Sequence, residues 1–387
     1  MENKKQTIEI ADIFRDYKHD LADNLTLCAV QQKAFDDIIS CRTSELGGHT
    51  LYCNNCDNKV QSYNSCRNRN CPKCQYIKRM QWVDKLAANL PVVKHFHIVF
   101  TIPSCLHNLF YINQQVAYSL LFKAVGKTLI QCAKNTEYLG VQAGAVALLH
   151  TWGQTLAYHP HIHTIVPAGG LSDDGMEWIP SAKKFFVPVK VLSAVFRGIL
   201  CRLLEEAINK GEIKLPDDTA CFQTLKTTCY AKKWVVYAQK PFSSVDNLIR
   251  YLGNYTHRVA ISNQRIIENK DGKVTFYYKD NKAGGTRKTM TLEVGEFIRR
   301  FMQHVLPSGF CKIRYFGFMA MCNMKTQLSL CYSLILTPTY LSKLDGLQAL
   351  EVLQILSGKD PIVCTKCNKG KLTVIPNSLN LLIIVVR

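Results

Sequence analysis

The chain has 387 residues and carries 48 Lys and Arg against 29 Asp and Glu, a net charge of +19. With 47% hydrophobic and 20% charged residues, the composition excludes both a disordered polyelectrolyte and a membrane protein. The length suggests two or three globular units. A positive surplus of this size favours a polyanionic partner, nucleic acid first of all, over a basic surface that is merely solvated.

The first residues and the longest late apolar run contain no export or membrane signal. The start, MENKKQTIEIADIF, includes acidic side chains and no apolar segment of signal-peptide length. The apolar run over residues 381–386 is far shorter than the ~18 residues that span a bilayer. We therefore expect a cytoplasmic protein without a membrane partner, whose 17 cysteines bind metal or lie buried rather than form disulfides.

Helical and extended patterns alternate along the chain. The spacing of apolar residues predicts helices within residues 6–40, 77–90, 106–134, 191–208 and 245–255. Strict alternation or short apolar runs predict strands over residues 95–100, 143–149, 156–166, 233–239, 265–268 and 274–279, with glycine turns at 169–170 and 284–285. This mixture indicates an α+β fold in which antiparallel strands pack against helices.

A cysteine cluster precedes the first of these strands. Cys53 and Cys56 form one C-x2-C pair, Cys71 and Cys74 form a second, and 14 residues separate the pairs. This spacing is typical of zinc ribbons, in which four thiolates hold one Zn2+. Because a module of about 40 residues is too small to fold on its own core, we expect a structural zinc to stabilise it.

The remaining cysteines leave the ligand set open. Cys41, His49 and Cys66 lie close enough in sequence to act as alternative ligands or as a partial second site. Near the other end of the chain, Cys364 and Cys367 form half of a site. That pair either borrows ligands from elsewhere or is an inert remnant, and the sequence does not distinguish the two.

The cysteine-rich stretch is also basic. Residues 41–80 hold seven Lys or Arg against two acidic residues, a net charge of +5. A surface pinned by a metal and carrying this charge suits contact with phosphates. Candidate DNA contacts in this stretch are Arg67, Arg69 and Lys73.

A histidine row occupies the predicted strand over residues 156–166. His159, His161 and His163 alternate with other residues, so on a strand all three project from one face. We take His161 and His163 as ligands of a divalent metal, with His159 or Gln154 as the third ligand. The alternative is a polar strand face whose histidines are satisfied by hydrogen bonds.

Two tyrosines lie on the predicted helix over residues 245–255. Tyr251 and Tyr255 stand at i and i+4, hence on one face of that helix, at the flank of its apolar stripe. A phenol is a weak nucleophile at neutral pH and needs a target polarised by a nearby cation. Taken alone, the pair would be read as two tyrosines that only pack.

Five stretches of the sequence, in order, resemble a known family: CRTSELGGH, SCRNRNCPKCQ, LLHTWGQTLAYHPHIHTIVPAGGLS, YLGNYTHRVAIS and HVLPSGFCKIRYFG. The family is that of the rolling-circle insertion-sequence transposases, two-tyrosine members of the HUH endonuclease superfamily with an N-terminal zinc-binding domain. The resemblance spans residues 40–370. One departure is Asn70, where the family's zinc motif commonly has His.

The resemblance implies a fold and a division of the chain. The catalytic domain would be an RRM-like antiparallel sheet flanked by helices, preceded by a small zinc-binding domain. We expect five regions: a helical lead-in (1–40), the zinc-binding domain (41–90), a HUH nuclease domain with its tyrosine helix (91–260), a basic C-terminal region (261–356) and a tail with the C-x-x-C half-site (357–387).

The resemblance also implies an activity. Tyr251 and Tyr255 would be paired nucleophiles that cut a DNA strand and leave a 5′-phosphotyrosine and a free 3′-OH. Mg2+ or Mn2+ held by His161 and His163 would polarise the scissile phosphate. Because the covalent bond conserves the energy of the cleaved linkage, rejoining would need no ATP, in agreement with the absence of a P-loop motif.

The expected partners are single-stranded DNA at the element ends, target DNA and host replication factors. Residues 255–314 carry twelve Lys or Arg against five acids and include Arg258, Arg265 and the aromatic run 276–278. This composition suits backbone contact combined with base stacking. Two alternatives from other classes are a zinc-dependent nucleic-acid-binding protein without catalysis and a metal-dependent hydrolase without a covalent intermediate.

Overall fold

The structure is a computed structural model that describes residues 8–19, 25–181, 186–239, 242, 260–280, 283–337 and 340–374. The chain divides into two compact units. The first unit combines residues 1–85, 257–305 and 343–387, and the second combines residues 86–256 and 306–342. The units are therefore interleaved along the chain, whereas the sequence suggests five consecutive regions.

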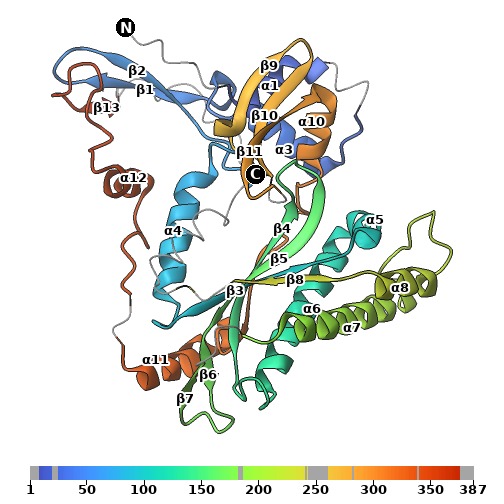
Figure 1. The fold of residues 1–387 in the computed structure, drawn as a ribbon. Helices are drawn as coiled ribbons and strands as arrows, with labels where there is room; N and C mark the ends of the chain where they lie inside the picture. Colours follow the sequence, from blue (N-terminus) through green and yellow to red (C-terminus); the bar gives the residue numbers. More distant parts are fainter. Residues whose placement is uncertain are drawn as a thin grey trace. The chain divides into compact units, whose positions relative to one another are not determined.

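The second unit is built around a five-stranded sheet in the order β12-β4-β5-β3-β8, in which every neighbouring pair is antiparallel. Its strands are β3 (His95–Thr101), β4 (Gly144–Trp152), β5 (Tyr158–Pro167), β8 (Val235–Ala238) and β12 (Ile313–Gly317). Helices α6 (Gln114–Lys134) and α7 (Val189–Asn209) pack side by side against it (Figure 1). The expected α+β class and helix-flanked antiparallel sheet are confirmed.

One face of this sheet is apolar and the other carries histidines. Phe96, Ile98 and Phe100 of β3 belong to the hydrophobic core formed with α6 and α7, and the Phe100 ring lies 5.1 Å from that of Phe196 on α7. Because successive side chains of a strand point to opposite faces, His97 faces away from these helices. The strand pattern of the sequence thus predicts correctly which face of β3 is buried against helices.

Short elements complete the second unit: α5 (His107–Ile112), α8 (Phe222–Ala231), α11 (Ser329–Ile335), β6 (Gly169–Leu171) and β7 (Trp178–Pro180). The sequence predicts a turn at Gly169 and Gly170, but the structure places both in β6. A Cβ atom on Gly170 would lie 2.4 Å from the carbonyl oxygen of Gln142. Glycine at this position therefore allows the backbones of β6 and Gln142 to approach closely, and it does not form a turn.

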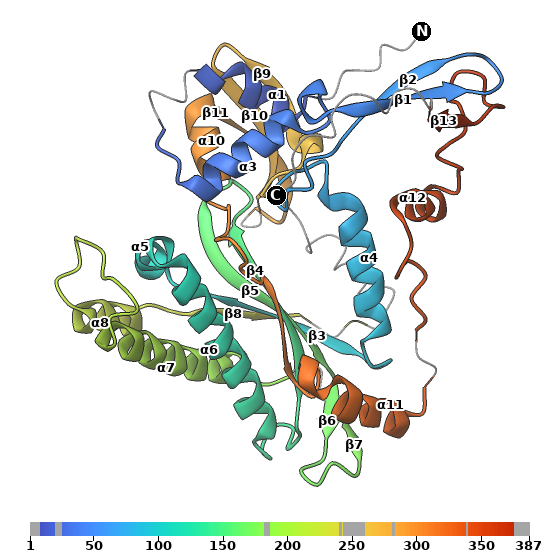
Figure 2. The same cartoon turned by 180° about the vertical axis from the view of Figure 1, so that it is seen from behind.

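The first unit contains the sheet β11-β10-β9 and three helices. Their bounds are β9 (Ile266–Lys270), β10 (Lys273–Asp280), β11 (Thr286–Glu293), α1 (Ile10–Asp16), α3 (Ala29–Ser40) and α10 (Val294–Met302) (Figure 2). The Phe14 ring stacks on Phe35 at 5.0 Å and meets the edge of Phe301 at 5.3 Å. Aromatic packing thus joins the first helices to the stretch after residue 260.

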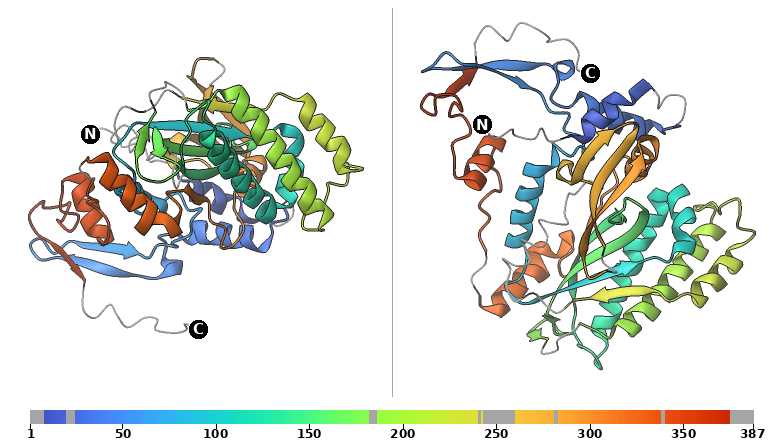
Figure 3. Two further views of the ribbon diagram at one scale, coloured as in Figure 1. Left: turned by 90° about the horizontal axis from the view of Figure 1, so that it is seen from below. Right: turned by 45° about the horizontal axis from the view of Figure 1, so that its top comes forward.

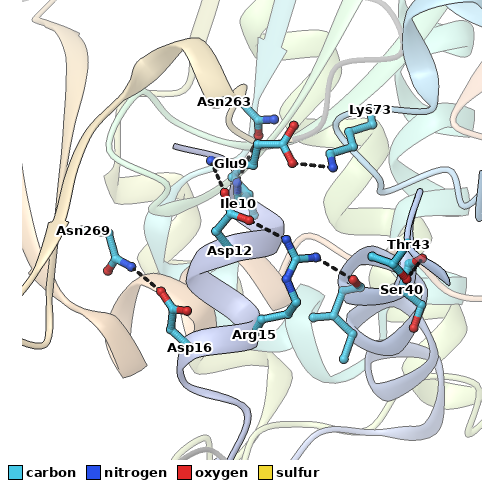
Figure 4. A network of polar contacts seen from close by, with 11 residues as sticks. Glu9, Ile10, Asp12, Arg15, Asp16, Ser40, Thr43, Lys73, Asn263 and Asn269 are labelled. Atoms are coloured by element: carbon cyan, nitrogen blue, oxygen red, sulfur yellow. Dashed lines mark hydrogen bonds and ion pairs between the residues drawn. The ribbon is translucent and has the colours of Figure 1, made fainter. Parts of the chain in front are cut away.

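Hydrogen bonds strengthen this connection (Figure 4). The backbone N–H of Ile10 donates to Asn263 Oδ1 at 3.2 Å, and Asn269 Nδ2 donates to Asp16 Oδ2 at 3.0 Å. Both contacts span 253 positions of sequence. Helix α1 therefore belongs to one body with the segment that contains β9.

The rest of the first unit is a three-stranded sheet in the order β13-β1-β2 with two helices. The bounds are β1 (Gly48–Cys53), β2 (Lys59–Tyr63), β13 (Leu372–Val374), α4 (Gln75–Ala88) and α12 (Ala349–Ser357). Among the residues that the structure describes, every helix is too short or too polar to span a membrane.

Gly317 marks the point where β12 closes on β4, and we expect its replacement to be costly. Its φ is +60°, and a Cβ atom would lie 1.8 Å from the carbonyl oxygen of Ala143. Gly317→Ala should therefore destabilise the second unit by more than about 2 kcal/mol. The matched control is Gly198→Ala within α7, where no atom lies within 4 Å of the new Cβ and a gain of about 0.5 to 1 kcal/mol is expected. Differential scanning calorimetry checks both, and an unchanged melting temperature of Gly317→Ala would contradict the β12–β4 pairing.

Candidate metal centre

Three histidines come together on the sheet face that points away from α6 and α7. They are His150 on β4 and His161 and His163 on β5, and their ligand nitrogens all lie within 4.8 Å of one another. His150 pairs directly with His161 across the two strands, which brings β-carbons to about 4.5–5.5 Å. His163 is two residues further along β5 and so shares the face. The Trp152 ring stacks on His150 at 4.8 Å and holds its orientation.

Hydrogen bonds fix which nitrogen each β5 histidine presents. His161 Nδ1 lies 2.6 Å from the carbonyl oxygen of His159, which can only accept, so Nδ1 carries the proton. His97 Nδ1 lies 3.2 Å from Gln239 Oε1, and His97 Nε2 lies 2.9 Å from His163 Nδ1. The amide oxygen of Gln239 can only accept, so His97 Nδ1 carries the proton and His97 Nε2 is left to accept. His163 Nδ1 therefore donates to His97 Nε2. Nε2 of both ligands therefore keeps its lone pair for a metal, and His97 positions His163.

Burial keeps these imidazoles neutral. Desolvation lowers the pKa of His161 to about 4 and holds the pKa of His163 well below its usual range, with the neighbouring histidines adding to the effect. Burial likewise lowers the pKa of His97 to about 4. At neutral pH His161 and His163 are therefore neutral, and a metal that binds at Nε2 need not displace a proton.

The donor set fits a divalent cation. Among the described residues, the group consists of His150, His161 and His163 without a carboxylate or thiol. Imidazole nitrogen is a common ligand of first-row divalent metals, and three protein ligands leave positions open for a substrate oxygen. Three protein ligands with open positions are typical of catalytic sites, because structural sites are usually closed.

The structure brings together two of the three histidines predicted from sequence. His161 and His163 are in the group, but His159 is not, and its ring instead meets the edge of His107 at 5.9 Å. The β4–β5 register shifts between His150 and Trp152, so that Trp152 pairs with Tyr158 and the row of facing histidines ends before His159. We therefore propose His150 in place of His159 as the third ligand. Gln154, the other candidate, lies in the turn between the two strands.

Tyr251 and Tyr255, predicted as nucleophiles, lie outside the described residues, as does the helix predicted over residues 245–255. The same holds for Arg258. The roles of these three residues therefore remain predictions from the sequence.

Four cysteines of the first unit form what we call the first cysteine cluster: Cys41, Cys66, Cys71 and Cys74. Cys74 Sγ lies 3.5 Å from Cys41 Sγ and 3.7 Å from Cys66 Sγ. A tetrahedral zinc with Zn–S bonds of about 2.3 Å requires sulfurs about 3.8 Å apart. The cluster therefore fits a closed, structural Zn2+ site between the end of α3 and the start of α4.

The zinc set predicted from sequence is not brought together. Cys71 and Cys74 join Cys41 and Cys66, the residues left open as alternatives, while Cys53 and Cys56 lie beside Cys364 and Cys367. The physical reason is the β1–β2 hairpin, which starts after Cys41 and projects Cys53 and Cys56 at its tip, away from the later pair. His49 lies within β1 and belongs to neither cluster.

The basic residues predicted to contact DNA differ in whether their side chains are already bound within the protein. Lys73 forms an ion pair with Glu9 and its side chain is only 16% exposed, so its charge is used within the protein (Figure 4). Arg265 Nε donates to the carbonyl oxygen of Tyr277 at 2.7 Å. Arg67 directly follows a ligand of the first cysteine cluster and has a φ of +57°, and Arg69 lies two residues on. Arg67, Arg69 and Lys73 as DNA contacts stay predictions from the sequence.

The second unit carries a histidine group that could hold a metal, and the first unit carries a cysteine cluster that fits zinc. Comparisons with known proteins find the same combination of domains in transposases. The family described as "Transposase zinc-binding domain" matches residues 13–102, and the family described as "Putative transposase" matches residues 144–327. The "Putative transposase y4qJ" of Sinorhizobium fredii (strain NBRC 101917 / NGR234) is 38% identical over 376 residues, 95% of this chain and 94% of that protein. The "Transposase for insertion sequence element IS801" of Pseudomonas savastanoi pv. phaseolicola is 28% identical over 294 residues, 75% of this chain and 70% of that protein.

The chain belongs to the rolling-circle insertion-sequence transposases with an N-terminal zinc-binding domain. Among solved structures, the conjugative relaxase TrwC in complex with oriT DNA matches 64% of this chain and 95% of its own at 10% identity, with a TM-score of 0.23. A score this low does not define the fold, which rests on the strand order described above.

Proposed function

We propose that this transposase nicks and rejoins single-stranded DNA at insertion-sequence ends through a 5′-phosphotyrosine intermediate. The observation that carries the proposal is the group of His150, His161 and His163 on the sheet face that points away from α6 and α7, within the stretch that matches the transposase family. A hydrolase would use such a centre as well, so the tyrosines distinguish the two functions.

The three histidines would hold Mg2+ or Mn2+, which when bound neutralises charge on the scissile phosphate. The chain's own residues prepare the site before DNA arrives. Gln239 and His97 hold His163 in one tautomer, and the carbonyl oxygen of His159 does the same for His161. A ligand set fixed in this way loses little conformational freedom on binding.

Tyr251 or Tyr255 would supply the nucleophile. The phenol oxygen attacks phosphorus, the new O–P bond forms as the bond from phosphorus to the 3′-oxygen breaks, the phenol proton passes to solvent and the 3′-oxygen leaves as a hydroxyl. Attack by a 3′-OH on the phosphotyrosine reverses these changes and joins strands without ATP. With two tyrosines, one strand end can be held while the second strand is cut.

Single-stranded DNA would be bound by the first unit. Arg67 and Arg69 adjoin the first cysteine cluster, and Arg287 on the largely exposed strand β11 lies with its guanidinium 3.5 Å from the centroid of the Tyr277 ring. Cations interleaved with aromatic rings suit phosphate contact combined with base stacking. Arg265, anchored on Tyr277, would stiffen this surface.

The experiment uses labelled single-stranded DNA from an element end, incubated with the full chain and Mn2+ and resolved on a denaturing gel. We expect a covalent protein–DNA adduct that Tyr251→Phe together with Tyr255→Phe abolishes. Metal-dependent cleavage without an adduct would establish the hydrolase instead. Binding without cleavage would favour the nucleic-acid-binding protein without catalysis.

A further inference from the structure

We propose that the chain carries a second structural zinc, bound by Cys53 and Cys56 near its start and by Cys364 and Cys367 near its end. These four residues form the second cysteine cluster. The family's zinc-binding domain covers residues 13–102 and so includes only the first pair. The proposal concerns the architecture of the first unit and is independent of the catalytic function.

The sulfur positions fit a tetrahedral ion. Cys53 Sγ lies 3.7 Å from Cys367 Sγ, and Cys56 Sγ lies 3.8 Å from Cys364 Sγ. Four thiolates around zinc at about 2.3 Å stand about 3.8 Å apart. All four sulfurs lie within 4.8 Å of one another, although the pairs are more than 300 positions apart in sequence.

The two C-x-x-C turns share one local geometry. The residue that follows each pair, Asp57 or Asn368, has a left-handed backbone, with φ of +54° and +55°. Asp and Asn tolerate this conformation better than most residues. The repeated geometry makes the pair at the C-terminal end a complete metal-binding turn rather than a remnant.

Hydrogen bonds to sulfur support the same assignment. The N–H of Asn55 donates to Cys53 Sγ at 3.5 Å, and the N–H of Gly370 donates to Cys367 Sγ at 3.3 Å. Donors aimed at sulfur favour the thiolate, the form that binds metal. Gly370 has a further role, because a Cβ atom there would lie 2.5 Å from Cys53 Sγ.

Backbone pairing brings residues 364–374 to the β1–β2 hairpin (Figure 3). Strand β13 runs antiparallel to β1, with Cys53 opposite Leu372, and the N–H of Asn54 donates to the carbonyl oxygen of Lys371 at 3.1 Å. The side chain of Asn54 accepts from the N–H of Lys371 at 2.8 Å. The residues of β1, β2 and β13 are mostly exposed or half-buried, so this small sheet lacks an apolar core of its own. A bound metal can stabilise such a small sheet in place of an apolar core.

One zinc ion bound by both cysteine pairs would hold the turn at residues 364–367 against the β1–β2 hairpin. Residues 364–374 would then be part of the zinc-binding module. Loss of the C-terminal pair would then free both the hairpin tip and β13.

The test is the zinc content of the purified full chain, measured by plasma mass spectrometry. We expect two zinc ions per chain, and one in the Cys364→Ser, Cys367→Ser double variant. The matched control replaces two exposed cysteines outside both clusters, Cys311→Ser and Cys322→Ser, and should keep two. One zinc in the wild type, iron in its place, or two zinc ions in the Cys364→Ser, Cys367→Ser variant would overturn the proposal.

A second measurement does not depend on the variant folding. The wild-type chain is treated with an alkylating reagent before and after removal of zinc by a chelator, and the modified peptides are identified by mass spectrometry. Cys364 and Cys367 should be protected at least tenfold until the zinc is removed. Equal labelling before and after chelation would contradict a metal at this position.

Discussion

Replacing His163 by alanine is expected to abolish metal-supported DNA cleavage. The variant removes one of three ligands and leaves His97 without the donor that it faces at 2.9 Å. If the metal lowers the barrier by about 4 kcal/mol, its loss corresponds to a cleavage rate about 1,000-fold lower. The rate is measured with a labelled oligonucleotide over a titration of Mn2+.

The matched control for this prediction is His159→Ala. His159 lies on the same strand and was the third ligand predicted from sequence, but it stands outside the group. We expect its variant to keep a rate within about tenfold of wild type and His150→Ala to match the loss of His163→Ala. A severe loss for His159→Ala with normal activity of His150→Ala would restore the ligand set read from the sequence.

The second large effect is expected for Cys71→Ser in the first cysteine cluster. Cys71 is only 1% exposed, and its neighbours within the site are three further thiols. Structural zinc binds such sites with apparent free energies of about 10 to 16 kcal/mol, which far exceeds the typical stability of a small domain. The variant should lose one zinc and expose the junction of α3 and α4 to protease within minutes.

The control for Cys71→Ser is Cys28→Ser, at an exposed position outside both clusters. It should keep its zinc content and its resistance to limited proteolysis. A Cys71→Ser chain that retains full zinc and resists protease would show that these sulfurs do not bind the ion.

Local patterns in the sequence predict the local structure well. The alternation of Phe96, Ile98 and Phe100 identifies the core face of β3, because a strand has a period of two whatever it pairs with. The helices α4 and α7 likewise lie close to their predicted ranges, whereas the helix predicted over residues 106–134 is divided into α5 and α6. These features depend on the spacing of residues that are close together in the sequence, so they can be predicted from it.

Contacts between distant residues are not predicted in the same way. The third ligand, His150, sits opposite His161 only because of the register of β4 and β5, which no single strand reveals. Its one visible signal is a histidine at the end of the predicted strand over residues 143–149. The register shift that excludes His159 leaves no mark in the pattern of the strand itself.

The cysteine pairs illustrate the same limit. Two C-x-x-C motifs at ribbon spacing predict one site, but the β1–β2 hairpin directs Cys53 and Cys56 to a pair more than 300 positions away. The interleaving of the two units has the same origin, because β9 and α10 contact α1, while β12 pairs with β4. Which segments pair is decided by the free energy of the whole fold.

The most direct test of the central claim is mass spectrometry of the trapped protein–DNA adduct after digestion with protease and nuclease. We expect a nucleotide linked through a 5′-phosphate to Tyr251 or Tyr255, formed only when a divalent metal is present. A nucleotide on any other residue, or strand cleavage in which no peptide carries a nucleotide, would contradict the proposed mechanism.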